Sequence, residues 1–301
     1  MIKRETRKKI KNWFIYISVL FFVKLLRSIS RLSAIRFMRF LAGAGYKLAR
    51  HEREKTIRHL TWAFGDQKSE QEIVEMSRKV FLHFGTAAAD AIRMPNIIRN
   101  GINNIVSISG REYLDQALDT GTILLTGHFG NWEILGAWMA QNGYPIKVVG
   151  TSAYDPRLDR MIVETRNMAG YENIARGKGT REIIRHLRNR GFLGILIDQD
   201  TRVEGVFVNF FNRPAHTAVG PAVLAKKLNL SVVSIFIHLL KDLTYHIEVG
   251  KPLNLVSMDD PDQELVANVQ ICSNEYEKAI RKHPEQWVWM HERWKKKPET
   301  V

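Results

Sequence analysis

Short apolar runs alternate with longer amphipathic segments from about residue 105 to residue 283, and this alternation is the feature that most constrains the fold. Residues 121–127 (GTILLTG) are the clearest run, because they are short, apolar and end at glycine, as a buried strand does. Residues 131–143 (NWEILGAWMAQNG) follow with helical periodicity and end at Gly143. Repeated strand–helix pairs predict an α/β fold with a mixed, mostly parallel sheet flanked by helices.

The other segments are assigned from the same patterns. The expected strands are 105–110, 146–150, 192–198 and 205–211, and two more form a hairpin around Lys241 and Asp242. The expected helices are 9–50, 52–63 and 69–93 in the N-terminal part, and 111–120, 155–170, 179–191, 216–229 and 260–284 after it. Catalytic groups of such folds lie at the C-terminal ends of strands, so the residues that follow the strands are the first candidates for a functional site.

The net charge of +14 is concentrated at the N-terminal end of the sequence. Residues 1–58 contain 16 Lys and Arg residues against three Glu, a net of +13, so the rest of the chain is close to neutral. A basic segment of this kind binds nucleic acid or anionic lipid. The near-neutral body lacks the basic, aromatic-rich pattern of a nucleic-acid-binding face, so we expect no nucleic acid partner.

The apolar run 13–23 (WFIYISVLFFV) favours lipid, because Ser18 is its only polar residue. Eleven residues fall short of the roughly 20 that a membrane-spanning helix needs. The flanking basic residues suit a helix that lies in the interface of an anionic membrane; a buried core helix with a solvated basic face is the alternative. We predict a basic, hydrophobic membrane-anchoring helix over 1–50 and an α/β domain over 51–301, with a helical lead-in over 51–100.

The run 126–133 (TGHFGNWE) contains the residues best suited to chemistry. His128 lies at the end of an expected buried strand, and Glu133 falls in the first turn of the next helix. Gly127 and Gly130 allow a tight turn that would fold the carboxylate back towards the imidazole. His128 would then take the proton of a substrate hydroxyl as general base, while Glu133 would orient the ring and stabilise the imidazolium. Free N–H groups at the helix start would stabilise an oxyanion.

This pattern is weak by itself, because roughly one His-x4-Asp/Glu match is expected by chance in a chain of this composition. The alternative is a core histidine hydrogen-bonded to a helix-capping glutamate. The sequence has no G-x-S-x-G motif, no P-loop and no convincing metal-ligand spacing, so neither a metal nor a cofactor is expected. The single cysteine, Cys272, excludes an internal disulfide.

At GHFGNWE (127–133) the chain resembles the late acyltransferases of lipid A biosynthesis, the lauroyl and myristoyl group within the lysophospholipid acyltransferase superfamily. The resemblance extends over most of the chain and includes the short N-terminal hydrophobic segment. It continues through Glu164-Thr165-Arg166, Ile197-Asp198-Gln199-Asp200, residues 205–227 and the ending 287–294, which reads WVWMHERW.

The resemblance implies an acyltransferase without a cofactor, with an acyl thioester as co-substrate. The donor implied is acyl carrier protein, and the acceptor is a glycolipid hydroxyl, expected to belong to a lipid A precursor. The enzyme would work at the anionic surface of the inner membrane, on its cytoplasmic face. An acceptor that is another glycolipid or a lysophospholipid stays open, as does a thioesterase or phospholipase that uses the same dyad. The sequence lacks the F-P-E-G-T-R run of the glycerol-phosphate branch, which counts against a simple glycerolipid acceptor.

Site residues follow from the matching positions. His128 and Glu133 correspond to the catalytic dyad. The residues assigned to substrate binding are Gly130, Asn131, Arg166, Asp198, Asp200 and Arg213. Asp200 is placed equally well as Asp198, and Arg213 has a guanidinium suited to a sugar or lipid phosphate, although it could also brace the turn before Pro214. Arg166 could equally lie on a solvated helix face, and the two aspartates could cap a loop.

Overall fold

The structure is a computed structural model that describes residues 4–151, 155–175, 177, 179–200 and 203–298. Within these residues, one sheet has the strand order β1-β9-β8-β2-β5-β3-β4, and β6 and β7 form a separate hairpin. The strands are β1 (Val106–Ser109), β2 (Thr122–Thr126), β3 (Ile146–Gly150), β4 (Glu172–Ala175), β5 (Phe192–Leu196), β6 (Gly205–Phe210), β7 (Arg213–Ala218), β8 (Val232–Leu239) and β9 (Tyr245–Pro252). Neighbours in the large sheet are parallel except β8 and β9. The predicted α/β class with a mixed, mostly parallel sheet is confirmed.

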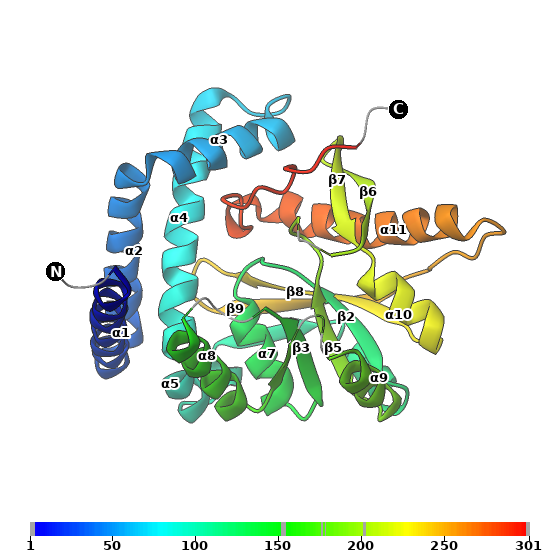
Figure 1. The fold of residues 1–301 in the computed structure, drawn as a ribbon, viewed down its shortest axis with the longest axis horizontal. Coiled ribbons are helices and arrows are strands. Elements are labelled where there is room, and N and C mark those ends of the chain that lie inside the picture. The colour runs from blue at the N-terminus through cyan, green and yellow to red at the C-terminus, as the bar shows by residue number, and fades with distance from the viewer. Residues whose placement is uncertain (1–3, 152–154, 176, 178, 201–202, 299–301) are drawn as a thin grey trace.

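Helices pack on both faces of the large sheet (Figure 1). They are α5 (Met94–Arg99), α6 (Arg111–Gln116), α7 (Trp132–Gln141), α8 (Pro156–Ala169), α9 (Thr180–Arg188), α10 (Gly220–Leu228) and α11 (Pro261–Lys282). The α5 and α7 helices contribute to the hydrophobic core on one face, and α10 and α11 to the core on the other. A 3-10 turn at Pro284–Gln286 then leads into the C-terminal segment.

The central strand β2 shows how the sequence specifies these two layers. All five of its residues are buried, because β5 and β8 flank it and helices cover both faces. Successive side chains of a strand point to opposite faces. Ile123 and Leu125 accordingly belong to the core beneath α11, whereas Leu124 belongs to the core beneath α7. An uninterrupted apolar run is therefore what this position in the sheet requires.

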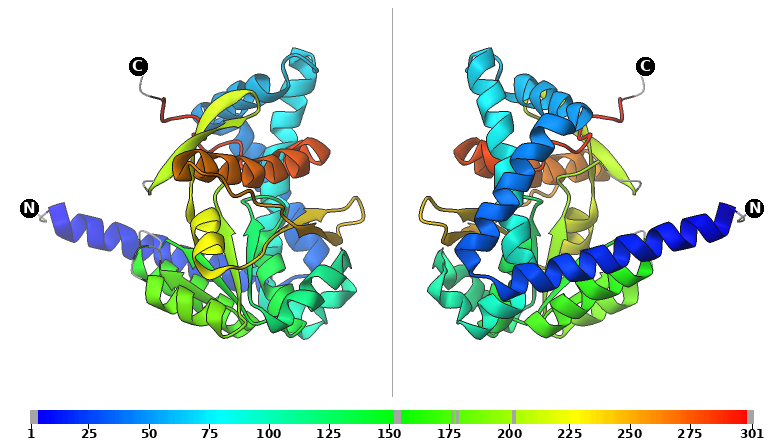
Figure 2. Two further views of the ribbon diagram at one scale, coloured as in Figure 1. Left: turned by 90° about the vertical axis from the view of Figure 1, so that its right-hand side faces the viewer. Right: turned by 90° about the vertical axis from the view of Figure 1, so that its left-hand side faces the viewer.

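Before α5, the described chain forms α1 (Arg4–Ser28), α2 (Arg31–Leu48), α3 (Arg50–Phe64) and α4 (Glu70–Ile92). Leu26 of α1 and Ile35 of α2 pack with Ala89 of α4 in a small core of their own. Much of α1 projects away from the rest of the molecule (Figure 2). No helix in the part of the chain that is described combines the length and the apolar character needed to cross a membrane. Residues 1–3 of the predicted anchoring segment lie outside the described residues.

Two expected helices differ from the observed ones, and some observed elements were not expected. The helix expected over 9–50 is broken after Ser28, because Ser30 adopts an extended conformation and its hydroxyl caps α2 at the Ser33 N–H. The helix expected over 216–229 begins at Gly220, since the preceding residues pair with β6 as strand β7. The sequence analysis also missed the short strand β4 and the short helix α5.

Candidate active site

A tight loop between β2 and α7 presents His128 at the C-terminal edge of the sheet. Gly130 turns the loop with φ +60°, and a Cβ at this position would lie only 1.7 Å from the carbonyl oxygen of Ile237. The Gly130 N–H donates to the Gln286 carbonyl at 2.9 Å, and the His83 ring donates from Nε2 to the Gly130 carbonyl at 3.1 Å. Only glycine fits this close approach of two backbones, so the loop is held rigidly from both sides.

The imidazole of His128 is oriented by Asp198. His128 Nδ1 lies 2.9 Å from Asp198 Oδ1, and the His128 backbone N–H donates to Oδ2 at 2.8 Å. The Trp287 indole N–H also donates to Oδ2, at 2.9 Å, and the His128 ring meets Trp132 edge-on. Burial acts to raise the pKa of Asp198, but His128 and the hydrogen bonds to the carboxylate hold that pKa below its ordinary value. An ionised Asp198 fixes the proton on Nδ1 and leaves Nε2 as the base.

Sheet register explains why Asp198 is the partner. The parallel strands β2 and β5 pair Thr126 with Leu196. Two residues further along each chain, this register places His128 beside Asp198. In the sequence, His128 follows the apolar run of β2 and Asp198 follows the apolar run of β5. Their contact could be predicted only with the knowledge that β2 and β5 are neighbours in the sheet.

Glu133 has different partners from those that the sequence analysis expected. The guanidinium of Arg166 on α8 donates two hydrogen bonds to the Glu133 carboxylate, from Nε to Oε2 at 3.0 Å and from Nη2 to Oε1 at 2.5 Å. The Tyr171 hydroxyl donates to Oε2 at 2.6 Å. Burial acts to raise the pKa of Glu133, but Arg166 holds it below its ordinary value. This bidentate ion pair turns the carboxylate towards α8, so Asp198 rather than Glu133 contacts the imidazole of His128.

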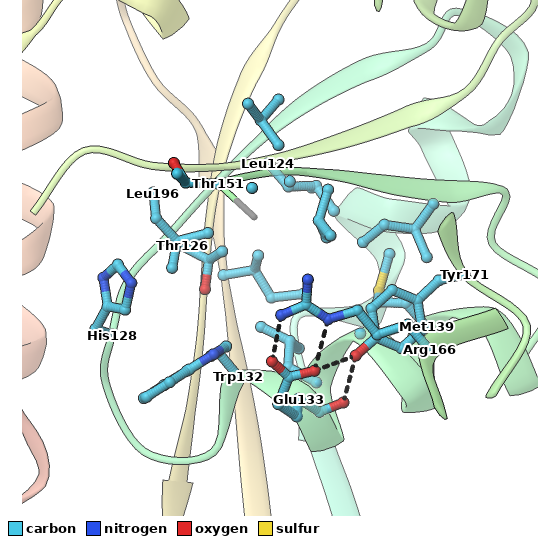
Figure 3. Close-up of a pocket in the computed structure, with 18 of the residues that line it drawn as sticks. Leu124, Thr126, His128, Trp132, Glu133, Met139, Thr151, Arg166, Tyr171 and Leu196 are labelled. Carbon is cyan, nitrogen blue, oxygen red and sulfur yellow. Dashed lines mark hydrogen bonds and ion pairs between the residues drawn. The ribbon is translucent and has the colours of Figure 1, made fainter. Parts of the chain in front are cut away.

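A cavity of about 360 Å³ is lined by His128, Glu133, Arg166 and Tyr171, among other residues. In Figure 3, His128 lies at one side of the cavity, and Glu133, Arg166 and Tyr171 lie together at the other. Apolar side chains from the sheet and α7 form much of the rest of the lining, among them Leu124, Met139, Val148 and Ile235. A cavity with one polar end and an apolar lining suits a ligand that has a reactive carbonyl or hydroxyl and a hydrocarbon part.

A second, smaller cavity adjoins the first. Its volume is about 220 Å³, and Glu133 and Arg166 line both cavities. The other lining residues are mainly apolar and come from α1, α4, α5 and α8. The Glu133–Arg166 ion pair therefore stands between the cavity beside His128 and an apolar space beneath α1.

The remaining predicted residues lie outside the lining of the main cavity. Asn131 is buried and braces the loop, because its amide donates to the Ala87 carbonyl at 3.1 Å while its oxygen caps α7 at the Ile134 N–H. Asp200 accepts from the Lys296 N–H at 3.0 Å, and the exposed Arg213 lies over the ring of Trp62 at 4.7 Å. The structure thus brings four predicted residues together, namely His128, Glu133, Arg166 and Asp198. It adds Trp132, Tyr171 and Trp287, which no motif singled out as site residues.

The chain is similar to known acyltransferases. A family described as bacterial lipid A biosynthesis acyltransferase matches residues 1–296. A phosphatidylinositol mannoside acyltransferase of Mycobacterium tuberculosis is 25% identical over 219 residues, which are 70% of this chain and 67% of the relative. A phosphatidylinositol mannoside acyltransferase of Mycolicibacterium smegmatis is 23% identical over 263 residues, or 85% and 84% of the two chains.

Proposed function

Because the chain belongs to the bacterial lipid A biosynthesis acyltransferase family, it is an acyltransferase of the glycolipid type, and we propose that His128 is the base of its reaction. The observation that carries the proposal is the His128–Asp198 pair, whose imidazole lines a cavity that has both polar and apolar side chains in its lining. The proposed reaction moves a fatty acyl group from a thioester to a hydroxyl of a glycolipid. The site offers a polar position for the reacting groups and apolar space for an acyl chain.

The proposed chemistry needs one proton acceptor and no covalent enzyme intermediate. His128 Nε2 takes the proton of the acceptor hydroxyl as its oxygen attacks the thioester carbonyl carbon. Asp198 stabilises the imidazolium that forms, and free N–H groups at the start of α7 stabilise the oxyanion. When the intermediate collapses, the carbon–sulfur bond breaks and the imidazolium returns the proton to the leaving thiolate. The products are the acylated lipid and a free thiol.

Glu133 and Arg166 are proposed to bind the acceptor rather than to orient His128. Their ion pair faces the main cavity, and Tyr171 holds the carboxylate from the other side. A carboxylate and a guanidinium side by side accept and donate hydrogen bonds to sugar hydroxyls, and a guanidinium also binds phosphate. The acceptor that we propose is a lipid A precursor, whose sugar part would lie against this pair. The relatives named for phosphatidylinositol mannoside make that glycolipid class the alternative to test.

The proposed donor is an acyl carrier protein. Arg58, Arg213 and Lys297 are exposed and lie over one ring, that of Trp62, at 5.6, 4.7 and 6.0 Å from its centroid. These three cations define a basic patch. Lys296, the residue before Lys297, donates its backbone N–H to Asp200, and Asp200 follows Gln199, which lines the main cavity. A positive patch beside the cavity would attract an acidic carrier and speed its encounter with the enzyme.

The proposed site of action is the cytoplasmic face of the inner membrane. Large apolar side chains on α1 and α2 are exposed, including Phe14 at 60%, Phe21 at 69% and Phe40 at 71%. Basic residues lie on the same two helices. This combination suits a helix pair that lies in the interface of an anionic membrane, and each Lys or Arg near such a surface adds about 1 kcal/mol of attraction.

Transfer of labelled acyl groups from acyl carrier protein tests the proposal. The acceptor panel contains a lipid A precursor, phosphatidylinositol mannoside, a lysophospholipid and no lipid, and the enzymes are wild type, His128→Ala and the exposed-histidine control His51→Ala. We expect label on the lipid A precursor, no transfer by His128→Ala and normal transfer by His51→Ala. Label that appears only as free acid, whatever acceptor is present, would favour the hydrolase, and transfer by His128→Ala would exclude this residue as the base.

A further inference from the structure

Two histidines and a glutamate meet away from the cavity, where the β8–β9 hairpin packs against the end of α11. In the antiparallel pairing of these strands, His238 lies opposite His246 and Phe236 lies opposite Glu248. His238 and Glu248 are therefore diagonal neighbours on one face of the hairpin. His283, the residue that ends α11, stacks on His238 with ring centroids 4.1 Å apart. One atom from each of His238, Glu248 and His283 lies within 4.8 Å of the others.

In the part of the chain that the structure describes, the ring nitrogens of the two histidines are not used in hydrogen bonds, whereas one oxygen of Glu248 is. Among the described residues, no hydrogen bond reaches a ring nitrogen of His238, which is 6% exposed, or of His283. Glu248 Oε2 accepts from Lys282 at 2.6 Å, while Oε1 faces His238 Nδ1 at 3.9 Å. The ring nitrogens of both histidines are therefore available to a ligand, close to a carboxylate oxygen.

Three side chains make up the proposed ligand set. The neighbouring His246 does not belong to the set, because its two ring nitrogens already bond to the hydroxyls of Ser107 and Ser109, at 2.8 and 3.0 Å. Lys282 is the cation beside the cluster, and it occupies only the outer oxygen of Glu248.

We propose that His238, His283 and Glu248 bind a zinc ion. Two imidazole nitrogens and one carboxylate oxygen are a zinc ligand set, with water in the fourth position. Imidazole ligands argue against Mg²⁺ and Ca²⁺, which take oxygen ligands. Ligand atoms around tetrahedral zinc lie roughly 3.3 Å apart, so the three side chains would close in slightly and the stacked rings would turn towards the ion. The ligands are 10 and 35 residues apart in sequence, and this spacing is why the sequence analysis expected no metal.

The site would stabilise the loop that carries His128 without taking part in acyl transfer. Ile237, the neighbour of His238, packs its carbonyl against Gly130, and Gln286, three residues after His283, accepts the Gly130 N–H. A zinc ion would join the β8–β9 hairpin to the end of α11, and these two elements hold Gly130 from either side. The proposal is independent of the proposed acyl-transfer reaction.

Zinc binding to untagged, chelator-treated full-length protein tests the proposal, by competition with a chromophoric chelator and by the visible spectrum of the Co²⁺-loaded protein. We expect one ion per chain, a tetrahedral Co²⁺ spectrum and a higher melting temperature with zinc. Loss of a second-shell group alone costs 10–100-fold in metal affinity, so His283→Asn and Glu248→Gln should each weaken binding by at least about tenfold. Both residues are half-exposed, so both variants should fold, and His51→Asn should bind as wild type does.

Three results would overturn the proposal. The first is the absence of stoichiometric binding at micromolar zinc. The second is zinc binding that survives in both His283→Asn and Glu248→Gln. The third is a loss of zinc affinity in His51→Asn equal to that in these two variants. Melting curves of the metal-free variants separate a lost ligand from a damaged fold, because a lost ligand removes only the zinc-dependent part of the melting temperature.

Discussion

At the scale of single residues, the pairing of His128 with Asp198 departs from the motif that drew attention to the site. The motif places an acid five residues after His128, but that acid, Glu133, is bound by Arg166 and Tyr171. Sequence patterns reveal which residues carry reactive groups, and they predicted His128 and Glu133, while the family resemblance added Arg166 and Asp198. They do not reveal which acid contacts which base, because that depends on strand order and on the competing cation from α8.

Asp198→Asn separates the two acids functionally. Replacing the acid of a Ser-His-Asp triad by its amide lowers kcat about 10⁴-fold, and we expect a loss of about 10³-fold or more here because the imidazolium loses its counter-charge. Glu133→Gln is the matched substitution, and we expect it to act mainly on the KM for the acceptor lipid. Steady-state kinetics with both substrates varied gives these values. A Glu133→Gln enzyme that loses kcat while Asp198→Asn keeps it would reverse the assignment.

His83 makes a prediction about pH. Burial lowers its pKa to about 4 in the folded protein, against about 6.5 for an ordinary histidine. The folded state therefore favours the neutral ring. The resulting contribution to the free energy of unfolding is complete above pH 6.5 and is lost as the pH falls towards 4. The difference amounts to about 3 kcal/mol of unfolding free energy. Urea unfolding from pH 7 to pH 4 should show a steeper loss of stability for wild type than for His83→Gln. Parallel curves would contradict this.

At the scale of elements, the strand-to-helix loop after β2 is the best-predicted part of the molecule. An apolar run of strand length that ends at glycine and leads into a periodic segment admits one interpretation. Strand β7 was not predicted, because its last residues were assigned to the helix that follows it. Residues 213–218 have weak strand propensity and include Pro214, and they form β7 because β6 pairs with them and α11 packs on the hairpin. Contacts of this kind between distant segments outweigh local preference and are not visible in a single sequence.

Gly130→Ala measures how tightly the loop is held. The new methyl group would meet the Ile237 carbonyl and would require φ +60°, so the loop must move. Gly143→Ala is the control, because it also has positive φ, +85°, but no atom lies within 4 Å of the added carbon. We expect Gly143→Ala to cost about 1–2 kcal/mol of unfolding free energy and Gly130→Ala clearly more, with loss of turnover. Equal losses in urea unfolding would show that the contact with Ile237 is relaxed easily.

At the scale of the whole molecule, the uneven charge of the sequence matches the arrangement of the elements. The basic, apolar N-terminal segment forms α1 and α2, which pack on α4 and leave large apolar side chains exposed. The near-neutral remainder forms the sheet and its helices. The division into an anchoring segment over 1–50 and a domain over 51–301 stays a prediction from composition. Composition did not predict the break between α1 and α2 or the position of the second cavity beneath α1.

Vesicle binding tests the exposed face of the N-terminal helices. Burying one large apolar side chain contributes roughly 1.5–3 kcal/mol, so the double variant Phe14→Ser, Phe21→Ser should bind vesicles that contain anionic lipid at least about tenfold more weakly. Leu118→Ser is the control, because Leu118 is also exposed, at 39%, but lies outside α1 and α2. Co-sedimentation at several lipid concentrations gives the affinities. Unchanged binding by the double variant would exclude α1 as the membrane contact.

Charge reversal at the basic patch tests how the donor is delivered. Arg213→Glu should raise the KM for an acyl group carried by acyl carrier protein, because an acidic carrier loses attraction and meets a like charge. The same variant should use a small soluble acyl thioester as wild type does, since Arg213 does not line the cavity. Equal effects on the two donors would mean that Arg213 acts on the fold or on the acceptor instead.

The contact between Trp287 and Asp198 also has a consequence for the order of events during biosynthesis. Trp287 and Gln286 follow every strand of the sheet in sequence, yet they complete the surroundings of Asp198 and Gly130. A growing chain would therefore have made α1 long before it could close the site beside His128.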